Sequence, residues 1–404
     1  MLRIHRLAAR HLIVTHGFAR QAFFTVLAIF ATLAPHRAQG LDVVEFRADG
    51  NPQAKTVTGE VLAQADDGGL LLLGLDGRIW PLEPDDLLLH RQNDEPFTTY
   101  SPKQLAEQLR EELGSSFQVL PTKHYLICYS TSLEYAQWCE HLFERLDRAF
   151  TTYWEKRKFP LTQSRFPLVV LVFEDRKAYQ DYGRREVGEA IENIVGFYSL
   201  ETNRVALYDP TPKKRREQRN RRRSTKRRRN RDLAQATGSF NVATIIHEAT
   251  HQLAFNCGFH RRFADNPLWL TEGMALYFET PDPGSDDGWT KMGKINSDRL
   301  GQFRRSVARG RLPNTLRDLL TTDDLLRTPA TALDAYAEAW ALSYFLIRTK
   351  PQQYHAYLRK LNAKPPLVWD SPEERLADFQ EVFGDNLGQL DKQFVRYMTQ
   401  RGLR

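Results

Sequence analysis

Residues 247–251 read His-Glu-Ala-Thr-His, and residues 268–279 read LWLTEGMALYFE. Two histidines four positions apart lie on one face of a helix, one turn apart, so both imidazoles can reach a single metal ion. Glu248 is the next residue round the helix, where its carboxylate can take a proton from an attacking water molecule. The HExxH pattern therefore predicts a metal site on a helix.

The residues around this motif predict a central helix. Ser239 is a plausible N-cap and Gly258 a plausible stop after the last turn. Between them the apolar residues recur at helical spacing, at Val242, Ile245, Ile246 and Leu253. This apolar character disfavours the alternative of a surface helix that happens to carry two histidines.

A third ligand has to come from outside the motif, and three residues are candidates. In the extended pattern HExxHxxGxxH, Cys257 would take the third position, but Ala254 replaces the glycine that allows the chain to turn. We therefore expect the helix to continue and Cys257 to pack on it. His260 lies beyond Gly258, in a loop. Glu272 is favoured, because a second helix beginning after Asn266-Pro267 would carry its carboxylate back to the histidines.

At these residues the chain resembles the gluzincin zinc peptidases. HEATHQ at 247–252 followed by WLTEGMALYFE at 269–279 is most similar to the aminopeptidase branch, with HExxHQ and then WLNEGFAxYxE. The resemblance implies that His247, His251 and Glu272 bind one Zn²⁺ and that Glu248 is the general base.

Two further residues are candidates for supporting roles. Glu279 follows Glu272 by two helical turns, on the same face, so it could hold a zinc-binding histidine in place; the alternative is an exposed glutamate. Residues 336–346 (YAEAWALSYFL) resemble the YEKGxxVLxML helix of the aminopeptidase branch. There a tyrosine donates a hydrogen bond to the tetrahedral intermediate, and Tyr336 takes that position. The alternative is a core tyrosine, since Tyr344 is nearby.

The arrangement also resembles an uncharacterised group of secreted bacterial gluzincin-like proteins, in which an RVALYD-type strand precedes the HExxH helix. Zinc peptidases bind extended peptides along an edge strand beside the site. Our candidates for substrate binding are Arg204, Val205, Ala206 and Leu207, and the alternative is an ordinary sheet edge. The chain lacks the GxMEN motif, which in aminopeptidases supplies a carboxylate for the free amino terminus, so exopeptidase action is unsupported. The thermolysin-type ExxxD pattern is also missing, because Leu276 stands four residues after Glu272.

Patterning along the chain predicts an α+β protein that begins with a small all-β module, and the resemblance implies that the rest is a zincin-like catalytic domain. Residues 1–40 have the form of a signal peptide, with an apolar core at 22–34 that is short for a membrane anchor. We expect a small β-barrel-like module at 41–98, an α/β subdomain at 99–238, and a helical subdomain with the zinc site at 239–404.

The net charge of +7 comes from two short segments of the chain. Residues 213–231 contain 13 of the 57 Lys and Arg and only one acid, and residues 1–40 contain five Arg, which leaves 39 basic against 49 acidic residues. An acidic body argues against a nucleic-acid-binding fold. Mutual repulsion predicts that 213–231 is solvated and not a packed helix. It is a tolerated insertion, a site for an anionic partner, or a site of proteolytic activation or gating.

The sequence thus predicts a secreted or cell-envelope zinc metallopeptidase that acts on a peptide or protein substrate. The rival interpretation is a non-catalytic envelope protein with a structural zinc site that binds a polyanion through 213–231. A non-peptide amide as the substrate stays open. The intact Glu248 favours an enzyme, because a structural zinc site does not need that carboxylate.

Overall fold

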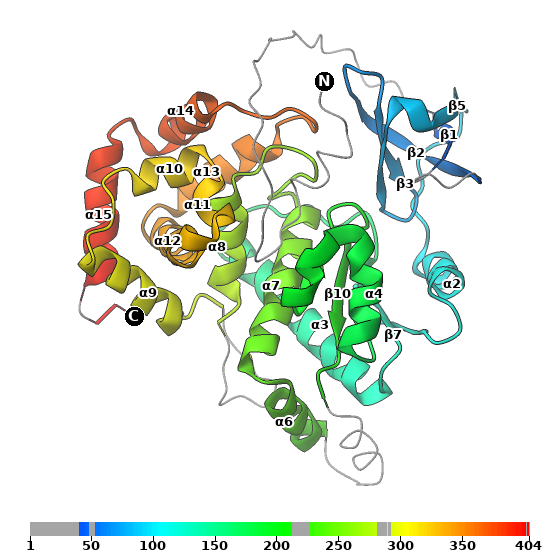
Figure 1. The fold of residues 1–404 in the computed structure, drawn as a ribbon, viewed down its shortest axis with the longest axis horizontal. Coiled ribbons are helices and arrows are strands. Elements are labelled where there is room, and N and C mark those ends of the chain that lie inside the picture. Colours follow the sequence, from blue (N-terminus) through cyan, green and yellow to red (C-terminus); the bar gives the residue numbers. More distant parts are fainter. Residues whose placement is uncertain are drawn as a thin grey trace.

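The computed structural model describes residues 40–47, 53–211, 226–280, 289, 292–400 and 402–403, with the backbone alone at 226–229. The predicted signal peptide, except for Gly40, and residues 213–225 of the basic run lie outside the described residues. Within them the fold is mixed α+β, with a β-rich N-terminal part and a mostly helical C-terminal half, as predicted (Figure 1).

The first module is an antiparallel sheet. Its strand order is β4-β3-β2-β1-β5. Val44, Phe46, Leu70, Leu72 and Leu82 form its core. Within the described residues β4 and β5 do not pair with each other, so the module is an open sheet and not the barrel that we expected. The strands are β1 (Asp42–Arg47), β2 (Ala54–Gln64), β3 (Leu70–Gly74), β4 (Ile79–Leu82) and β5 (Leu87–Gln92).

A second sheet carries the middle of the chain. Its strand order is β6-β7-β8-β10-β9, in which β7, β8 and β10 run parallel and both outer strands are antiparallel to their neighbours. The strands are β6 (Gln118–Pro121), β7 (Tyr125–Tyr129), β8 (Leu168–Phe173), β9 (Gly196–Tyr198) and β10 (Arg204–Tyr208). The apolar runs at 125–129 and 167–173 predict strands, and two apolar runs around SLETN predict a hairpin at 196–208; the structure confirms all three.

Helices cover both faces of this sheet, which explains why its central strands are apolar at every position. Leu126 and Cys128 on β7 face the helices α2 (Pro102–Leu113) and α4 (Arg176–Val187). The alternate residues Tyr125 and Ile127 face α3 (Leu133–Glu155) and α7 (Ser239–Asn256). The HExxH helix is therefore packed directly on the sheet.

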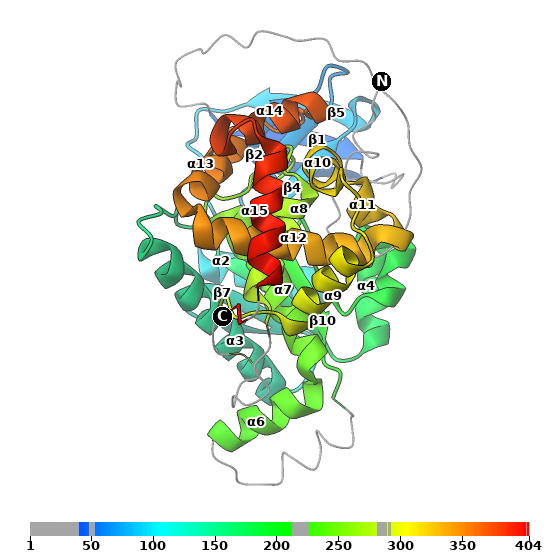
Figure 2. The same ribbon diagram turned by 90° about the vertical axis from the view of Figure 1, so that its left-hand side faces the viewer.

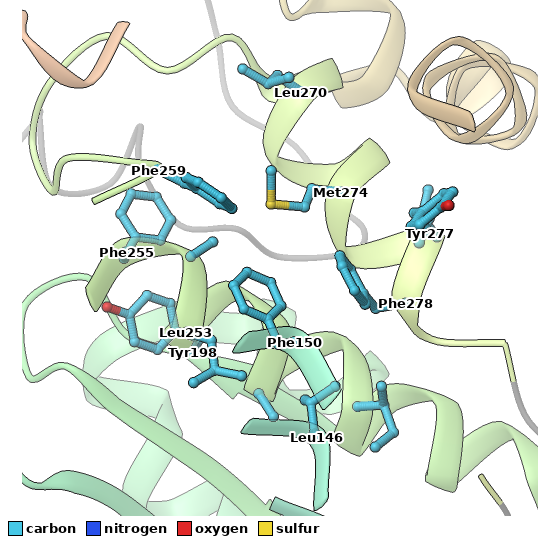
Figure 3. Close-up of a cluster of buried hydrophobic side chains, with 14 of the residues drawn as sticks. Leu146, Phe150, Tyr198, Leu253, Phe255, Phe259, Leu270, Met274, Tyr277 and Phe278 are labelled. Atoms are coloured by element: carbon cyan, nitrogen blue, oxygen red, sulfur yellow. The ribbon is translucent and has the colours of Figure 1, made fainter. Parts of the chain in front are cut away.

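The helical half lies on the opposite side of α7 from the first module (Figure 1). A large apolar core, which includes Phe150 of α3, Leu253 of α7 and Met274 of α8, joins the sheet layer to this half (Figure 3). The helices are α8 (Leu268–Phe278), α9 (Ser297–Ala308), α10 (Thr315–Thr321), α11 (Asp324–Arg327), α12 (Pro329–Thr349), α13 (Pro351–Asn362), α14 (Pro372–Phe383) and α15 (Leu387–Thr399).

The end of the basic run corrects one prediction. A helix, α6 (Lys226–Thr237), begins inside the run, so residues 226–231 are helical and not irregular (Figure 2). The apolar residues after the run explain the difference, because Leu233 and Ala234 are buried and belong to the main core. Within the described part of the chain, the helices are too short or too polar to cross a membrane.

Candidate metal centre

The HExxH helix begins and ends close to the predicted residues. Gly238, and not Ser239, is the N-cap of α7, with no side-chain capping bond, and Ser239 is the first helical residue. The C-cap is Cys257, and Gly258 follows with φ of +88°, a conformation in which glycine is favoured. The helix thus ends where Gly258 predicted. As expected, the helix continues past Ala254, and Cys257, its C-cap, packs against the main core.

A buried amide network fixes α7 on the second sheet. Gln252 Nε2 donates to the carbonyl oxygens of Val169 and Asn203, at 3.0 and 2.8 Å. Asn256 exchanges side-chain hydrogen bonds with Asn203, at 2.7 and 2.9 Å. Asn203 also accepts a bond from the Tyr198 hydroxyl. These bonds join the helix to the β9–β10 turn, so the position of the motif relative to the sheet is specified by polar pairing as well as by packing.

Helix α8 approaches α12 closely because residue 273 has no side chain. A Cβ atom at Gly273 would lie 2.1 Å from Ser343 Oγ and 2.5 Å from the Ala339 carbonyl oxygen, both on α12. Only glycine is compatible with this separation. The contact fixes the distance of α8 from α12 and, with it, the position of the preceding residue, Glu272. The Glu272 side chain is fully buried.

Three predicted ligands come together where α7 and α8 face each other. His251 Nε2 lies 3.1 Å from His247 Nε2, and Glu272 oxygens lie 3.3 Å from His247 Nε2 and 3.6 Å from His251 Nε2. Ligands at roughly 2.0–2.1 Å from a tetrahedral metal ion are about 3.3 Å apart. The three donors therefore already have the spacing of three corners of such a site.

The hydrogen-bond state of Glu272 supports the same conclusion. Neither carboxylate oxygen has a hydrogen-bond partner among the described residues, although both are buried. An isolated buried carboxylate is strongly disfavoured unless a cation compensates it. His247, His251 and Glu272 form the one group in the described chain with the donor atoms and spacing to hold a metal ion.

Glu279 supports one of these histidines. As the C-cap residue of α8, it places Oε2 2.8 Å from His247 Nδ1. If Nδ1 carries the proton and donates it to Glu279, Nε2 keeps its lone pair for a metal ion. Asn296 Nδ2 donates to the other oxygen of Glu279 at 3.3 Å, and Arg299 Nε is 4.0 Å from that oxygen.

The two histidines have opposite pKa shifts. Burial lowers the pKa of His247, but the neighbouring carboxylates of Glu272 and Glu279 outweigh it and raise this pKa well above its ordinary value. Burial and the charge of His247 lower the pKa of His251 well below its usual range. The carboxylates around His247 therefore favour a positive charge at the position where a metal ion would bind.

Glu248 lies beside the three donors and is not one of them. Its Oε2 accepts a hydrogen bond from the backbone N–H of Tyr198 at 2.9 Å. Burial raises the pKa of Glu248 to about 8, helped by the charge of Glu272 and opposed by that of His247. A carboxyl group with a pKa near neutrality is suited to exchange protons at physiological pH.

Tyr336 comes to the same place from α12. Burial raises the pKa of its phenol well above the ordinary value, and the charges of Glu272 and Glu248 raise it further. The phenol therefore lies within electrostatic range of both carboxylates. Tyr344, the alternative on the same helix, instead packs against Tyr277 and Trp340.

The expectation of an edge strand at Arg204–Leu207 is wrong. Strand β10 pairs with β8 on one side and β9 on the other, so its backbone has no free edge. Arg204 is buried in a bidentate pair with Glu112. On this side of the described sheet the edge strand is β9, and β6 is the edge strand on the other side. Because Ser199 N–H bonds to the Arg204 carbonyl, the alternation of an antiparallel pair turns the Tyr198 N–H outward, toward Glu248.

The two other third-ligand candidates remain outside the group. The Cys257 thiol lies 3.7 Å from the Ala254 carbonyl oxygen, at the end of α7. His260 is buried, and within the described structure neither ring nitrogen has a hydrogen-bond partner. Burial lowers the pKa of His260 to about 3. Its ring packs against Phe255, with ring centroids 5.2 Å apart.

The sequence interpretation missed three groups that touch the centre. The backbone N–H of Tyr198 carries no sequence signal, because any residue at that position of the edge strand supplies it. Asn296 could have been recognised as an N-cap, but its contact with Glu279 depends on tertiary packing. Arg299 lies in the same helical turn, with its guanidinium 5.8 Å from the ring centroid of Tyr336.

Fold and site together define an α+β protein with a buried His-His-Glu group that could hold a metal ion. Residues 241–368, about a third of the chain, match the model of a family described as "Protein of unknown function (DUF1570)". This matched region begins in α7 and ends after α13, so it contains all three donors, Glu248 and Tyr336. No curated protein matches the chain.

Proposed function

We propose that the chain is a zinc-dependent metallopeptidase of the gluzincin type, with a zincin-like catalytic unit and a secreted or cell-envelope location. The observation that carries the proposal is the position of Glu248. A carboxylate that is not a donor stands beside a His₂Glu group with tetrahedral spacing. Two imidazoles and one carboxylate with an open fourth position are typical of catalytic zinc.

Each residue then has a defined task. A bound Zn²⁺ would supply Lewis acidity and lower the pKa of a water molecule. Glu248 accepts the proton of the attacking water and later donates a proton to the leaving amine. Tyr336 donates a hydrogen bond to the oxyanion that develops on the scissile carbonyl. His247 is kept in the correct tautomer by Glu279.

Substrate binding is assigned to the free edge of β9. An extended peptide that adds to this edge would use backbone hydrogen bonds and would lie next to Glu248, because the outward Tyr198 N–H already bonds to that side chain. The proposal covers peptides and proteins as substrates, and a non-peptide amide that fits the same edge would be cleaved by the same residues.

The test compares wild type with Glu248→Gln, each with metal analysis and a proteome-derived peptide-library digest. We expect stoichiometric zinc in both proteins and a loss of cleavage of about 10²–10⁴-fold in the variant. Glu107→Gln, an exposed change on α2, is the matched control and should cleave as wild type does. Equal cleavage by wild type and Glu248→Gln would contradict the proposal.

The rival function is a non-catalytic envelope protein that keeps zinc for its fold and binds a polyanion through 213–231. The burial of the centre favours it, since Glu248, His251 and Tyr336 are only 3 %, 1 % and 7 % exposed. Structural zinc sites are closed in this way. Stoichiometric zinc without any cleavage, together with heparin binding that disappears when 213–225 is deleted, would establish this rival.

A further inference from the structure

We infer that Asn296 and Arg299, at the start of α9, are positioning residues of the metal centre. Asn296 fixes the Glu279 carboxylate against His247, and Arg299 joins that carboxylate to the ring of Tyr336. The inference rests on the proposed metal site and is independent of whether the protein cleaves peptides.

Asn296 uses both ends of its amide. Its Oδ1 accepts the backbone N–H of Arg299 at 3.1 Å and so caps α9. Because Oδ1 faces a donor, the oxygen and nitrogen of the amide are distinguished. Nδ2 therefore points to Glu279 Oε1, at 3.3 Å. Asn296 is 9 % exposed and Glu279 is 8 % exposed, so the bond lies in the protein interior.

Helix capping alone does not explain why residue 296 is an asparagine. Serine and aspartate cap helices as well as asparagine does, and Ser101, Ser132, Asp175 and Ser371 cap four other helices of this chain. At residue 296 neither alternative would serve both functions. Aspartate has no donor for Glu279, and the serine side chain is shorter. Of these three capping residues, only asparagine supplies both bonds at position 296.

Arg299 adds a charge at the same carboxylate. Its Nε lies 4.0 Å from Glu279 Oε1, and its guanidinium carbon lies 5.8 Å from the centroid of the Tyr336 ring. The cation thus stands between the group that supports His247 and the phenol that we place at the reaction centre. Its side chain is 27 % exposed, so its contribution should be smaller than that of the buried amide.

The contacts form a chain of four links. The backbone of α9 holds Asn296, Asn296 holds one oxygen of Glu279, the other oxygen holds His247 Nδ1, and His247 Nε2 faces the metal position. Loss of such outer contacts typically costs about 10–100-fold in metal affinity, because the ligand is no longer oriented.

The experiment measures Zn²⁺ binding by the full chain in competition with a chromophoric chelator, and the visible absorption of the Co²⁺-substituted protein. We expect Asn296→Asp and Asn296→Ser to bind Zn²⁺ about 10-fold or more weakly and to alter the Co²⁺ spectrum. Both changes keep a capping oxygen, so α9 should remain folded. Asn386→Asp, at the exposed N-cap of α15, is the matched control and should bind within twofold of wild type.

A second pair of variants tests Arg299. Arg299→Met keeps the length of the stem and removes the charge, and we expect up to about fivefold weaker binding, as for a partly exposed ion pair. Arg305→Met, on the exposed side of the same helix, should have no effect.

Equal Zn²⁺ affinity and identical Co²⁺ spectra in wild type and both Asn296 variants would overturn the inference, as would an equal loss in Asn386→Asp. A wild-type chain that binds no metal would overturn the inference and the proposed function together. Weaker binding in the Asn296 variants, with no Glu248-dependent cleavage by wild type, would support the inference and reject the peptidase.

Discussion

One cluster of buried charge is built around Glu338 of α12 and another on α7 and α8, and the two differ in how their charges are compensated. Glu338, two residues after Tyr336, accepts hydrogen bonds from Arg311 Nε at 2.9 and 3.1 Å. Asp391 of α15 accepts two more from the same guanidinium, at 3.0 and 2.9 Å. This cluster is complete within the chain.

The metal centre is not complete in this sense. Glu272 is more deeply buried than Asp391, yet its oxygens have no hydrogen-bond partner in the described part of the chain. Burial alone therefore does not identify a metal site, because both clusters are buried. What separates them is whether hydrogen-bond donors of the surrounding residues satisfy each carboxylate.

The largest effect should come from breaking the complete cluster. Arg311→Met leaves two carboxylates without their partner, and we expect it to reduce the free energy of unfolding by about 3–5 kcal/mol, measured by urea denaturation. The exposed pair of Arg309 and Asp334 provides the control, since Arg309→Met should cost at most about 1 kcal/mol. A loss in Arg311→Met that added Zn²⁺ restores would contradict the distinction between the clusters.

A metal ion should stabilise only the incomplete cluster. At a free Zn²⁺ concentration 100 times the Kd, wild type should gain about 2.7 kcal/mol, and chelation should remove this gain. Glu272→Gln lacks one donor and should gain far less at the same concentration, by the same thermal or urea measurement. Equal stabilisation of both proteins would show that Zn²⁺ binds elsewhere.

A smaller effect should follow from separating α8 and α12. Gly273→Ala places a methyl group against Ser343 and the Ala339 backbone, and overpacking of this kind typically costs about 1–3 kcal/mol. Because Glu272 is the neighbouring residue, Zn²⁺ affinity should fall as well. Gly301→Ala on α9 is the control. Its Cβ would meet only the end of the Arg305 side chain, and it should stabilise the protein by up to about 1 kcal/mol.

Local patterns predicted much of the fold. The apolar runs and turn residues identified the strands β7, β8, β9 and β10, and apolar spacing and flanking residues identified the helices α7 and α8. The failures have a common cause. The order of strands in a sheet is set by long-range pairing, so β10 was wrongly expected at an edge that β9 occupies. Likewise the start of α6 depends on the burial of Leu233.

The sequence by itself determined the donors. The spacing of His247 and His251 requires one helix face, and the position of Glu272 at the start of the next helix follows from Asn266-Pro267. Tertiary structure alone decided how the two glutamates beside those donors, Glu248 and Glu279, are held. The Tyr198 N–H reaches Glu248, and Asn296 reaches Glu279, because separate elements pack around α7. Helical spacing is a local property of the backbone, whereas contacts between elements depend on which faces the core brings together.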